Sequence, residues 1–222
     1  MCGRFTLFAP AERIIRRFGL TTFPEAYVKR YNIAPSQPVL AVIHDGKENR
    51  AGFLRWGLIP SWANDEKIGY KLINARAETL GEKRSFQEAA QKRRCLIIAD
   101  GFYEWKREGN RKQPVRVQLK TGELFAMAGL WERWQSPNGE VLYTCAIVTT
   151  EANDLLRPFH PRMPVILPAE FEARWLDRSA RDLSDLQPLL KPYMAEEMLV
   201  YPVSDRVNSA AYDGPDLIEP VE

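Results

Sequence analysis

The central half of the chain is a succession of short apolar or alternating segments, each followed by turn-forming residues. Predicted strands occupy residues 40–44, 51–56, 94–99, 102–106, 114–119, 124–130 and 141–149. Between the first two, Asp45-Gly46 predicts a hairpin with a type I′ turn, because that turn needs positive φ angles. The later strands are separated by Gly-Asn, Thr-Gly and Asn-Gly pairs, which also favour turns. The pattern predicts an α+β fold whose centre is an antiparallel sheet curled into a barrel.

Helical spacing is confined to a few segments outside this region. Residues 10–18 begin with a proline and stop at Gly19, and residues 168–176 and 182–190 have apolar positions three to four apart. There is no internal repeat, low-complexity tract or linker rich in Gly or Ser, so we expect one domain, residues 1–222. No apolar run is long enough for a membrane span or a signal peptide, which predicts a cytoplasmic protein.

The cysteines and histidines are too few and too scattered to indicate a metal site. Cys95 and Cys145 lie in apolar runs, where a free cysteine behaves as a small buried hydrophobe. Three cysteines without an export signal favour reduced thiols. His44 and His160 are the only histidines, and no zinc motif is present. We therefore expect no metal.

The net charge of +2 conceals an uneven distribution. Residues 168–222 contain five Lys/Arg against twelve Asp/Glu, whereas residues 92–120 contain nine Lys/Arg against three Asp/Glu. A basic surface on the second segment would attract phosphate. An ordinary solvated charge pattern is the simpler interpretation of this feature alone.

Position 2 offers distinctive chemistry. If Met1 is removed, Cys2 carries an α-amine beside a thiol, both of which are nucleophiles. An aldehyde could form a Schiff base with the amine and then a thiazolidine with the thiol. The alternatives are acyl transfer by an N-terminal nucleophile and an incidental cysteine. If residues 2–8 form a strand, Cys2, Arg4 and Thr6 share one face.

Three further places have polar groups in unusual surroundings. Asn74, Arg76 and Glu78 alternate with small or apolar residues, which places them on one side of an extended segment or of a solvated edge strand. Glu104 lies between aromatic residues, where burial would raise its pKa as a general acid requires. His160 sits among prolines in a stiff loop that suits a proton shuttle. A buried structural glutamate and an ordinary loop histidine remain open alternatives.

Several blocks of sequence together resemble one known family. The blocks are Met-Cys-Gly-Arg-Phe (1–5), Tyr-Asn-Ile-Ala-Pro-Ser-Gln (31–37), Arg-Trp-Gly-Leu-Ile-Pro-Ser-Trp (55–62), Ile-Asn-Ala-Arg-Ala-Glu-Thr (73–79), Ala-Asp-Gly-Phe-Tyr-Glu-Trp-Lys (99–106), His-Pro-Arg-Met-Pro (160–164) and Pro-Val-Ser (202–204). In this order they resemble the SOS response-associated peptidase (SRAP) family. The resemblance implies one α+β domain built around antiparallel β-barrel-like sheets with a few peripheral helices. It also implies a protein that crosslinks itself to abasic sites in single-stranded DNA and removes its own Met1.

The same resemblance assigns roles to single residues. It implies that the catalytic residues are Cys2 for crosslinking, Asn74 for orienting the N-terminal group, Glu104 as acid/base and His160 for proton transfer. The residues that it implies for DNA binding are Arg4, Trp62, Arg76, Thr149 and Arg162. No cofactor is implied. We expect a monomer whose partner is abasic single-stranded DNA, with no membrane partner and with association to the nucleoid when DNA is damaged.

The expected mechanism combines the two lines of reasoning. Glu104 assists opening of the abasic sugar, the Cys2 amine forms an imine, and the Cys2 thiol closes a thiazolidine. β-Elimination from the imine would give a lyase side activity. Two other classes remain open: a thiol peptidase acting in trans through Cys2 with His160 and Asn74, and a module that binds single-stranded DNA without a covalent bond.

Overall fold

Strands form most of the framework in the computed structural model, which describes residues 2–109 and 111–221. They are β1 (Phe5–Leu7), β2 (Arg30–Ile33), β3 (Pro38–His44), β4 (Asn49–Trp56), β5 (Asn74–Arg76), β6 (Arg94–Ala99), β7 (Gly101–Glu108), β8 (Arg111–Leu119), β9 (Phe125–Gln135), β10 (Val141–Glu151), β11 (Arg162–Pro164), β12 (Ile166–Leu167) and β13 (Met198–Pro202). The α-helices are α1 (Ala11–Phe18), α2 (Gln87–Lys92) and α3 (Ala169–Leu176). Short 3-10 helices are η1 (Glu66–Lys71), η2 (Ala77–Thr79), η3 (Leu183–Asp185), η4 (Gln187–Leu189), η5 (Ala195–Glu197), η6 (Asp205–Asn208) and η7 (Pro215–Ile218).

Five strands close into a barrel, as the sequence predicts. β10 pairs with β4, β4 with β3, β3 with β6 and β6 with β9, and β9 returns to β10. β5, β11 and β12 extend this sheet. The arrangement is not wholly antiparallel, because β10 runs parallel to both β4 and β5. All six residues of β6 are buried, because one face of the strand lines the barrel interior and the other is covered by α2, α3 and β1.

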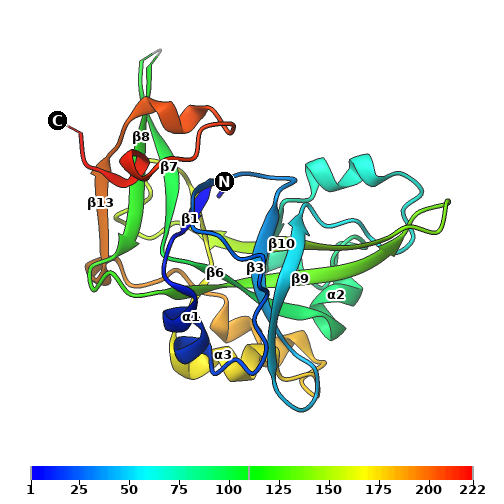
Figure 1. Ribbon diagram of the computed structural model, residues 1–222. Helices are drawn as coiled ribbons and strands as arrows, with labels where there is room; N and C mark the ends of the chain where they lie inside the picture. The colour runs from blue at the N-terminus through cyan, green and yellow to red at the C-terminus, as the bar shows by residue number, and fades with distance from the viewer. Residues whose placement is uncertain (1, 110, 222) are drawn as a thin grey trace.

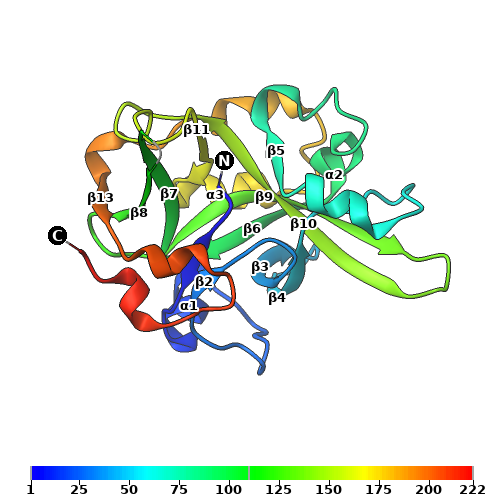
Figure 2. The same cartoon turned by 90° about the horizontal axis from the view of Figure 1, so that it is seen from above.

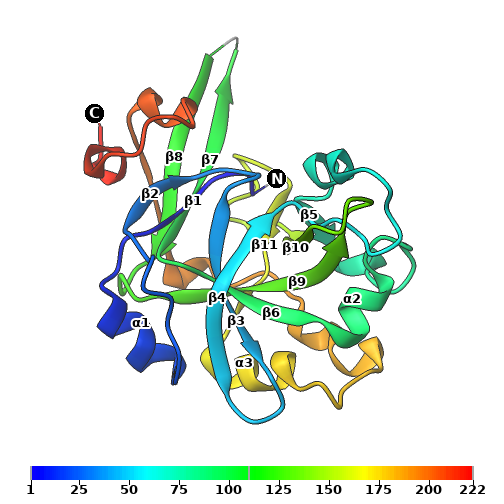
Figure 3. The ribbon, with the colours of Figure 1, turned by 45° about the vertical axis from the view of Figure 1, so that its right-hand side comes forward.

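A second sheet lies beside the barrel, and its strand order is β13-β8-β7-β1-β2 (Figure 1). In Figure 3, β7 and β8 rise from the body of the protein as a long hairpin. Asp100, between β6 and β7, joins the barrel to this sheet. Its carboxylate accepts hydrogen bonds from the Thr6 hydroxyl at 2.6 Å and from the backbone amide of Phe8 at 2.6 Å. These bonds hold β1, and therefore the N-terminus, against β7.

The barrel interior is packed tightly enough to require glycine at one position. A Cβ atom on Gly129 of β9 would lie 2.8 Å from the Cys95 sulfur. Cys95 and Cys145 are buried free thiols, as predicted. The same core continues under α1 and α3, whose apolar faces it buries. Within the described residues, no helix has both the length and the apolar character needed to cross a membrane.

Two local predictions are wrong. The chain turns between β3 and β4 over Asp45–Glu48, where Gly46 has a φ of 110° and no non-glycine residue has positive φ, so a type I′ turn does not form. Instead, the Asp45 carboxylate accepts hydrogen bonds from the amides of Lys47 and Glu48. Residues 182–190 form η3 and η4 rather than an α-helix, because Pro188 lacks an amide hydrogen.

The N-terminal strand is also shorter than predicted. β1 contains only Phe5–Leu7, and its register against β2 is irregular between these two residues. Cys2 and Arg4 therefore lie before the strand, and all three strand residues are buried. The condition for the expected face shared by Cys2, Arg4 and Thr6, a strand over residues 2–8, is therefore not met. Of the predicted turn at residues 108–110, Asn110 lies outside the described residues.

Candidate active site

The N-terminus enters the junction between the two sheets. Seen from above, its start lies between β7 and β5 (Figure 2). Met1 lies outside the described residues, so its predicted removal stays a prediction. Cys2 is fully buried. Residues from three distant parts of the sequence can therefore meet at Cys2.

Asn74 holds the main chain of Cys2. Its side-chain amide, at the start of β5, donates a hydrogen bond to the Cys2 carbonyl oxygen at 2.9 Å. The Asn74 Oδ1 atom is buried and has no hydrogen-bond partner in the described part of the chain. The Asn74 side chain therefore fixes the backbone at Cys2.

Glu104 is the acidic group next to Cys2. It lies on β7 opposite Val115 of β8 and is 4% exposed, as its aromatic neighbours in the sequence predict. Burial raises the pKa of the Glu104 carboxyl to about 7. Burial, together with the negative charge of Glu104, also raises the pKa of the Cys2 thiol. At neutral pH, Glu104 can therefore donate or accept a proton, while the Cys2 sulfur keeps its proton.

His160 faces the same cavity as Glu104. This cavity has a volume of about 300 Å³ and is lined by Glu104, Trp105, Arg107, Lys112, Phe159, His160 and Asn208. His160 Nδ1 lies 2.9 Å from the Arg162 amide nitrogen and 3.1 Å from the Arg162 carbonyl oxygen, so the Arg162 main chain holds the ring in either neutral tautomer. Burial lowers the pKa of His160 and favours the neutral ring.

The structure thus brings all four predicted catalytic residues together. Asn74 bonds to Cys2, the charge of Glu104 acts on the Cys2 thiol, and Glu104 and His160 line one cavity. The arrangement places Cys2, whose main chain is held by Asn74, near two side chains that can exchange protons.

The five predicted DNA-binding residues divide into exposed and internal groups. Arg76 is exposed on β5, and Trp62 is 43% exposed with the Arg84 guanidinium 4.6 Å from its ring centre. Thr149 is only 1% exposed, so its side chain offers almost no surface to DNA.

The other two predicted DNA contacts are engaged within the protein. Arg4 donates to Asn32 Oδ1 at 2.8 Å and to the Val207 carbonyl at 2.6 Å. Arg162 donates to both carboxylate oxygens of Glu78, at 2.7 and 2.9 Å. Each of these arginines therefore joins distant segments of the chain.

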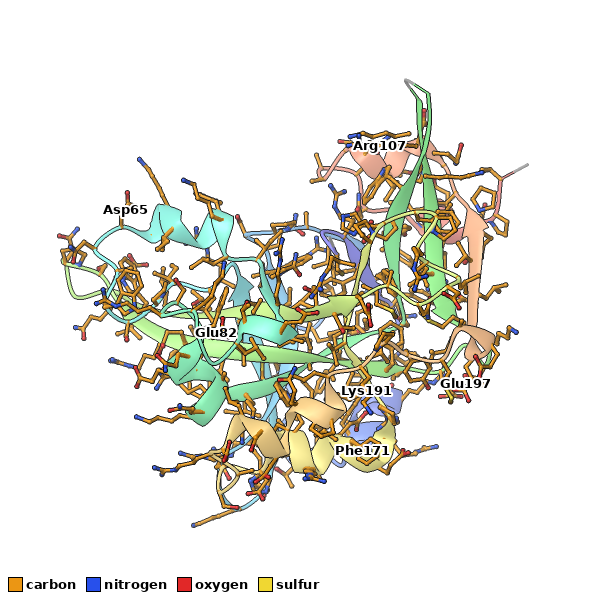
Figure 4. All side chains as sticks on the ribbon, turned by 180° about the vertical axis from the view of Figure 1, so that it is seen from behind. Asp65, Glu82, Arg107, Phe171, Lys191 and Glu197 are labelled. Carbon is orange, nitrogen blue, oxygen red and sulfur yellow. The ribbon has the colours of Figure 1, made fainter. Side chains whose placement is uncertain are left out.

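Sequence reasoning missed five residues of the cavity wall. Arg107 and Lys112 belong to the basic stretch 92–120, which was their only signal. Trp105 and Phe159 adjoin the predicted Glu104 and His160, whereas nothing in the sequence marks Asn208. Figure 4 shows Arg107 high on the β7–β8 hairpin, at the opposite end of the molecule from Phe171 of α3.

The basic stretch 92–120 does not form one surface. Arg94 and Arg116 are buried, and Arg93 pairs with Glu132 at 2.7 Å. Arg107 and Lys112 are the basic residues of this stretch that line the cavity. Among the described residues, no cluster of three or more His, Cys, Asp or Glu side chains could hold a metal ion.

Comparison with known proteins agrees with this geometry. The family model described as SOS response associated peptidase (SRAP) matches residues 1–210. The chain belongs to the SRAP family. This SRAP chain is 54% identical to the abasic site processing protein YoqW of Bacillus subtilis (strain 168), over 99% of each chain. It is 33% identical to the abasic site processing protein HMCES of Gallus gallus, over 100% of this chain and 78% of that protein.

The fold of this SRAP chain also matches a solved structure. A crystal structure of a protein from Bacteroides thetaiotaomicron aligns with a TM-score of 0.90 at 29% identity and covers all of both chains. The resemblance inferred from the sequence blocks and the barrel-centred α+β fold are therefore confirmed.

Proposed function

We propose that this protein captures abasic sites in single-stranded DNA by a covalent bond through Cys2, after Met1 has been removed by the protein itself. The observation on which the proposal rests is the hydrogen bond from Asn74 to the Cys2 carbonyl, which fixes the N-terminal residue beside Glu104. The family match and the names of the relatives agree with it.

The first chemical step joins the DNA aldehyde to the Cys2 amine. Glu104, with a pKa of about 7, transfers the proton that opens the cyclic hemiacetal and exposes the C1′ aldehyde. The amine then adds to the aldehyde carbon, and the resulting carbinolamine loses water to give an imine. His160 lines the same cavity as Glu104 and supplies the second proton-transfer group. One water molecule leaves for each imine formed.

The second step closes a ring. The Cys2 sulfur adds to the imine carbon to form a C–S bond, and the thiol proton passes to the nitrogen. The product is a thiazolidine, with no further loss of atoms. The raised pKa of the thiol suits this order, because a protonated sulfur does not compete with the amine for the free aldehyde. If an imine undergoes β-elimination before closure, the DNA strand breaks, which gives a lyase side activity.

Positioning of the DNA combines phosphate contacts with base stacking. Arg76 and the cavity residues Arg107 and Lys112 supply positive charge near the reacting group, and Trp62 offers an exposed ring for stacking. Arg4, Thr149 and Arg162 support this surface from inside. Because one chain supplies every reacting group, we propose that the protein acts as a monomer. Binding to damaged DNA places it at the nucleoid.

Peptidase activity in trans is the less favoured function. A papain-like thiol needs a depressed pKa, whereas burial raises the pKa of Cys2. The cavity of about 300 Å³ beside Glu104 is also at the lower limit for an organic ligand. Removal of Met1 needs no such cleft, because the scissile bond belongs to the chain itself.

Intact mass spectrometry tests the proposal directly. The protein is weighed alone and after incubation with a single-stranded oligonucleotide that carries one abasic site. We expect a protein without Met1 and a heat-stable adduct equal to protein plus oligonucleotide less one water. Retained Met1 without an adduct contradicts the proposal.

Cys2→Ala separates the two chemical steps. This variant keeps an α-amine but has no thiol, so borohydride should trap an imine while the heat-stable adduct disappears. A heat-stable adduct with Cys2→Ala would rule out the thiazolidine. A non-covalent binding module would give no adduct with either protein and would bind intact and abasic strands equally.

A further inference from the structure

Glu78 forms a bidentate ion pair that the proposed chemistry does not use. Its two carboxylate oxygens accept hydrogen bonds from Nη1 and Nη2 of Arg162 at 2.7 and 2.9 Å. The Arg162 side chain is 17% exposed and that of Glu78 is 48% exposed. Paired hydrogen bonds of this kind fix the plane of a guanidinium group, which a single-point surface ion pair does not.

Arg162 passes this constraint to His160. Its backbone amide donates to His160 Nδ1 at 2.9 Å, and its Nη2 atom donates to the Thr149 carbonyl at 2.6 Å. The side chain of Arg162 is thus anchored to β10 while its main chain holds the imidazole ring. A displacement of Arg162 would disturb the hydrogen bonding that orients the His160 ring.

Glu78 is itself held by the segment that carries Asn74. It lies in η2, directly after β5, and the flanking Ala77 is buried. β5 pairs in parallel with β10, where Arg76 lies opposite Thr149. The Glu78–Arg162 pair therefore ties the segment that fixes Cys2 to the segment that carries His160, with β10 between them.

We propose that Glu78 is a positioning residue, which clamps Arg162 and thereby sets the orientation of the His160 imidazole. Its effect on crosslinking rests on the proposed function, whereas its effect on the imidazole does not. The pKa of Glu78 is lowered, chiefly by the hydrogen bonds from Arg162, so the carboxylate stays ionised at neutral pH. Because the Arg162 side chain is largely buried and hydrogen-bonded within the protein, it serves more to position His160 than to bind a DNA phosphate.

A rival interpretation makes the opposite prediction. If Glu78 were a latch that DNA phosphate must displace from Arg162, removing its charge would free the arginine. DNA binding would then tighten and crosslinking would accelerate. The clamp predicts slower crosslinking, because a proton-transfer group that is poorly oriented loses rate.

Glu78→Gln tests the clamp, with Glu66→Gln as a matched control. Glu66 accepts a hydrogen bond from Arg55 at 2.7 Å, and its side chain is 47% exposed, so the control also neutralises one half-exposed carboxylate paired with arginine. The first readout is the ¹⁵N NMR spectrum of the histidine side chains without DNA. His44 and His160 are the only histidines, and His44 is an internal reference because its Nδ1 accepts from the Gly46 amide.

We expect the His160 nitrogens of the unaltered protein and of Glu66→Gln to show the same ¹⁵N shifts. In Glu78→Gln, the His160 shifts should change, because the hydrogen bonding of Nδ1 to the Arg162 main chain is altered, while those of His44 stay unchanged. The second readout is the rate of crosslinking to an abasic oligonucleotide, which should fall about tenfold or more in Glu78→Gln alone. Non-covalent affinity for an intact strand should change less than the rate.

The two readouts separate failure of the clamp from failure of the proposed function. Unchanged His160 shifts in Glu78→Gln would overturn the clamp, as would faster crosslinking with tighter DNA binding. If the unaltered protein forms no crosslink, the proposed function fails, and the NMR comparison still decides whether Glu78 positions His160.

Discussion

Replacing Glu104 with glutamine should make the protein more stable and less active, to an extent that depends on pH. The pKa of Glu104 is raised by burial from an ordinary value of 4.5 to about 7. Between these two values the folded protein retains a proton that the unfolded chain has lost. Stability therefore falls as pH rises through this interval and levels off above pH 7. Glutamine cannot ionise, so this loss should be absent in Glu104→Gln.

The size of the effect follows from the same two values. A pKa shift of one unit corresponds to 1.36 kcal/mol, so the shift of Glu104 corresponds to about 3 kcal/mol. Glu104→Gln should match the unaltered protein near pH 4 and exceed its free energy of unfolding by about 3 kcal/mol at pH 8.5. Other buried acids with raised pKa values, including Asp100 and Glu172, are present in both proteins and cancel in the difference.

Urea unfolding at pH 4, 5.5, 7 and 8.5 measures this difference. Crosslinking rates at the same pH values should show a Glu104-dependent change centred near pH 7, which disappears in the variant. If the free energy of unfolding depends on pH in the same way in both proteins, the claim that ionisation of buried Glu104 destabilises the fold is refuted. Equal losses of DNA binding and of crosslinking in Glu104→Gln would refute its role in proton transfer.

Three further outcomes are expected. Trp62→Ala should weaken binding of single-stranded DNA by about 1–3 kcal/mol, measured by fluorescence anisotropy, because it removes a stacking surface. An unchanged affinity would show that the bound DNA strand does not stack on Trp62. Gly57→Ala should destabilise the fold by about 2 kcal/mol or more in urea, since the φ of Gly57 is 132° and a Cβ would lie 2.7 Å from a carbonyl oxygen. Gly52→Ala, with nothing within 4 Å of its Cβ, is the control, and equal effects would contradict the reasoning. Arg94→Met should lower thermal stability, because Arg94 donates to backbone carbonyls in the last turns of α2 and α3, those of Ala90 and Trp175. An unchanged melting temperature would exclude this capping role.

Local sequence predicted the elements whose pattern depends on close neighbours. The strand predicted at residues 94–99 is β6, and the predicted helices at 10–18 and 168–176 agree with α1 and α3 to within one residue. Apolar runs, proline at a start and glycine at an end act within a few residues. The segment 182–190 shows the limit of such patterns, because its apolar spacing is helical but Pro188 breaks the hydrogen bonding.

The identity of the four catalytic candidates was accessible through the sequence blocks, but their proximity was not. Asn74 lies 72 residues from Cys2, and only barrel closure with a parallel β5–β10 pairing brings it there. The shape of the site has the same origin. Asn208 enters the cavity wall because the C-terminal segment packs against the second sheet, where the Trp105 indole donates to its side chain at 2.8 Å.

By itself, the sequence determined that the chain folds around strands, that Cys95 and Cys145 are core residues and that Glu104 is buried among aromatic side chains. These outcomes follow from apolar periodicity and local composition, which act over a few residues. Only the tertiary structure decided that Arg4 and Arg162 are bound inside the protein, and that Glu78, 84 residues before Arg162 in the chain, holds it. The partner of a charged side chain depends on strand register and barrel closure, which arise from contacts between distant segments and have no counterpart in local sequence.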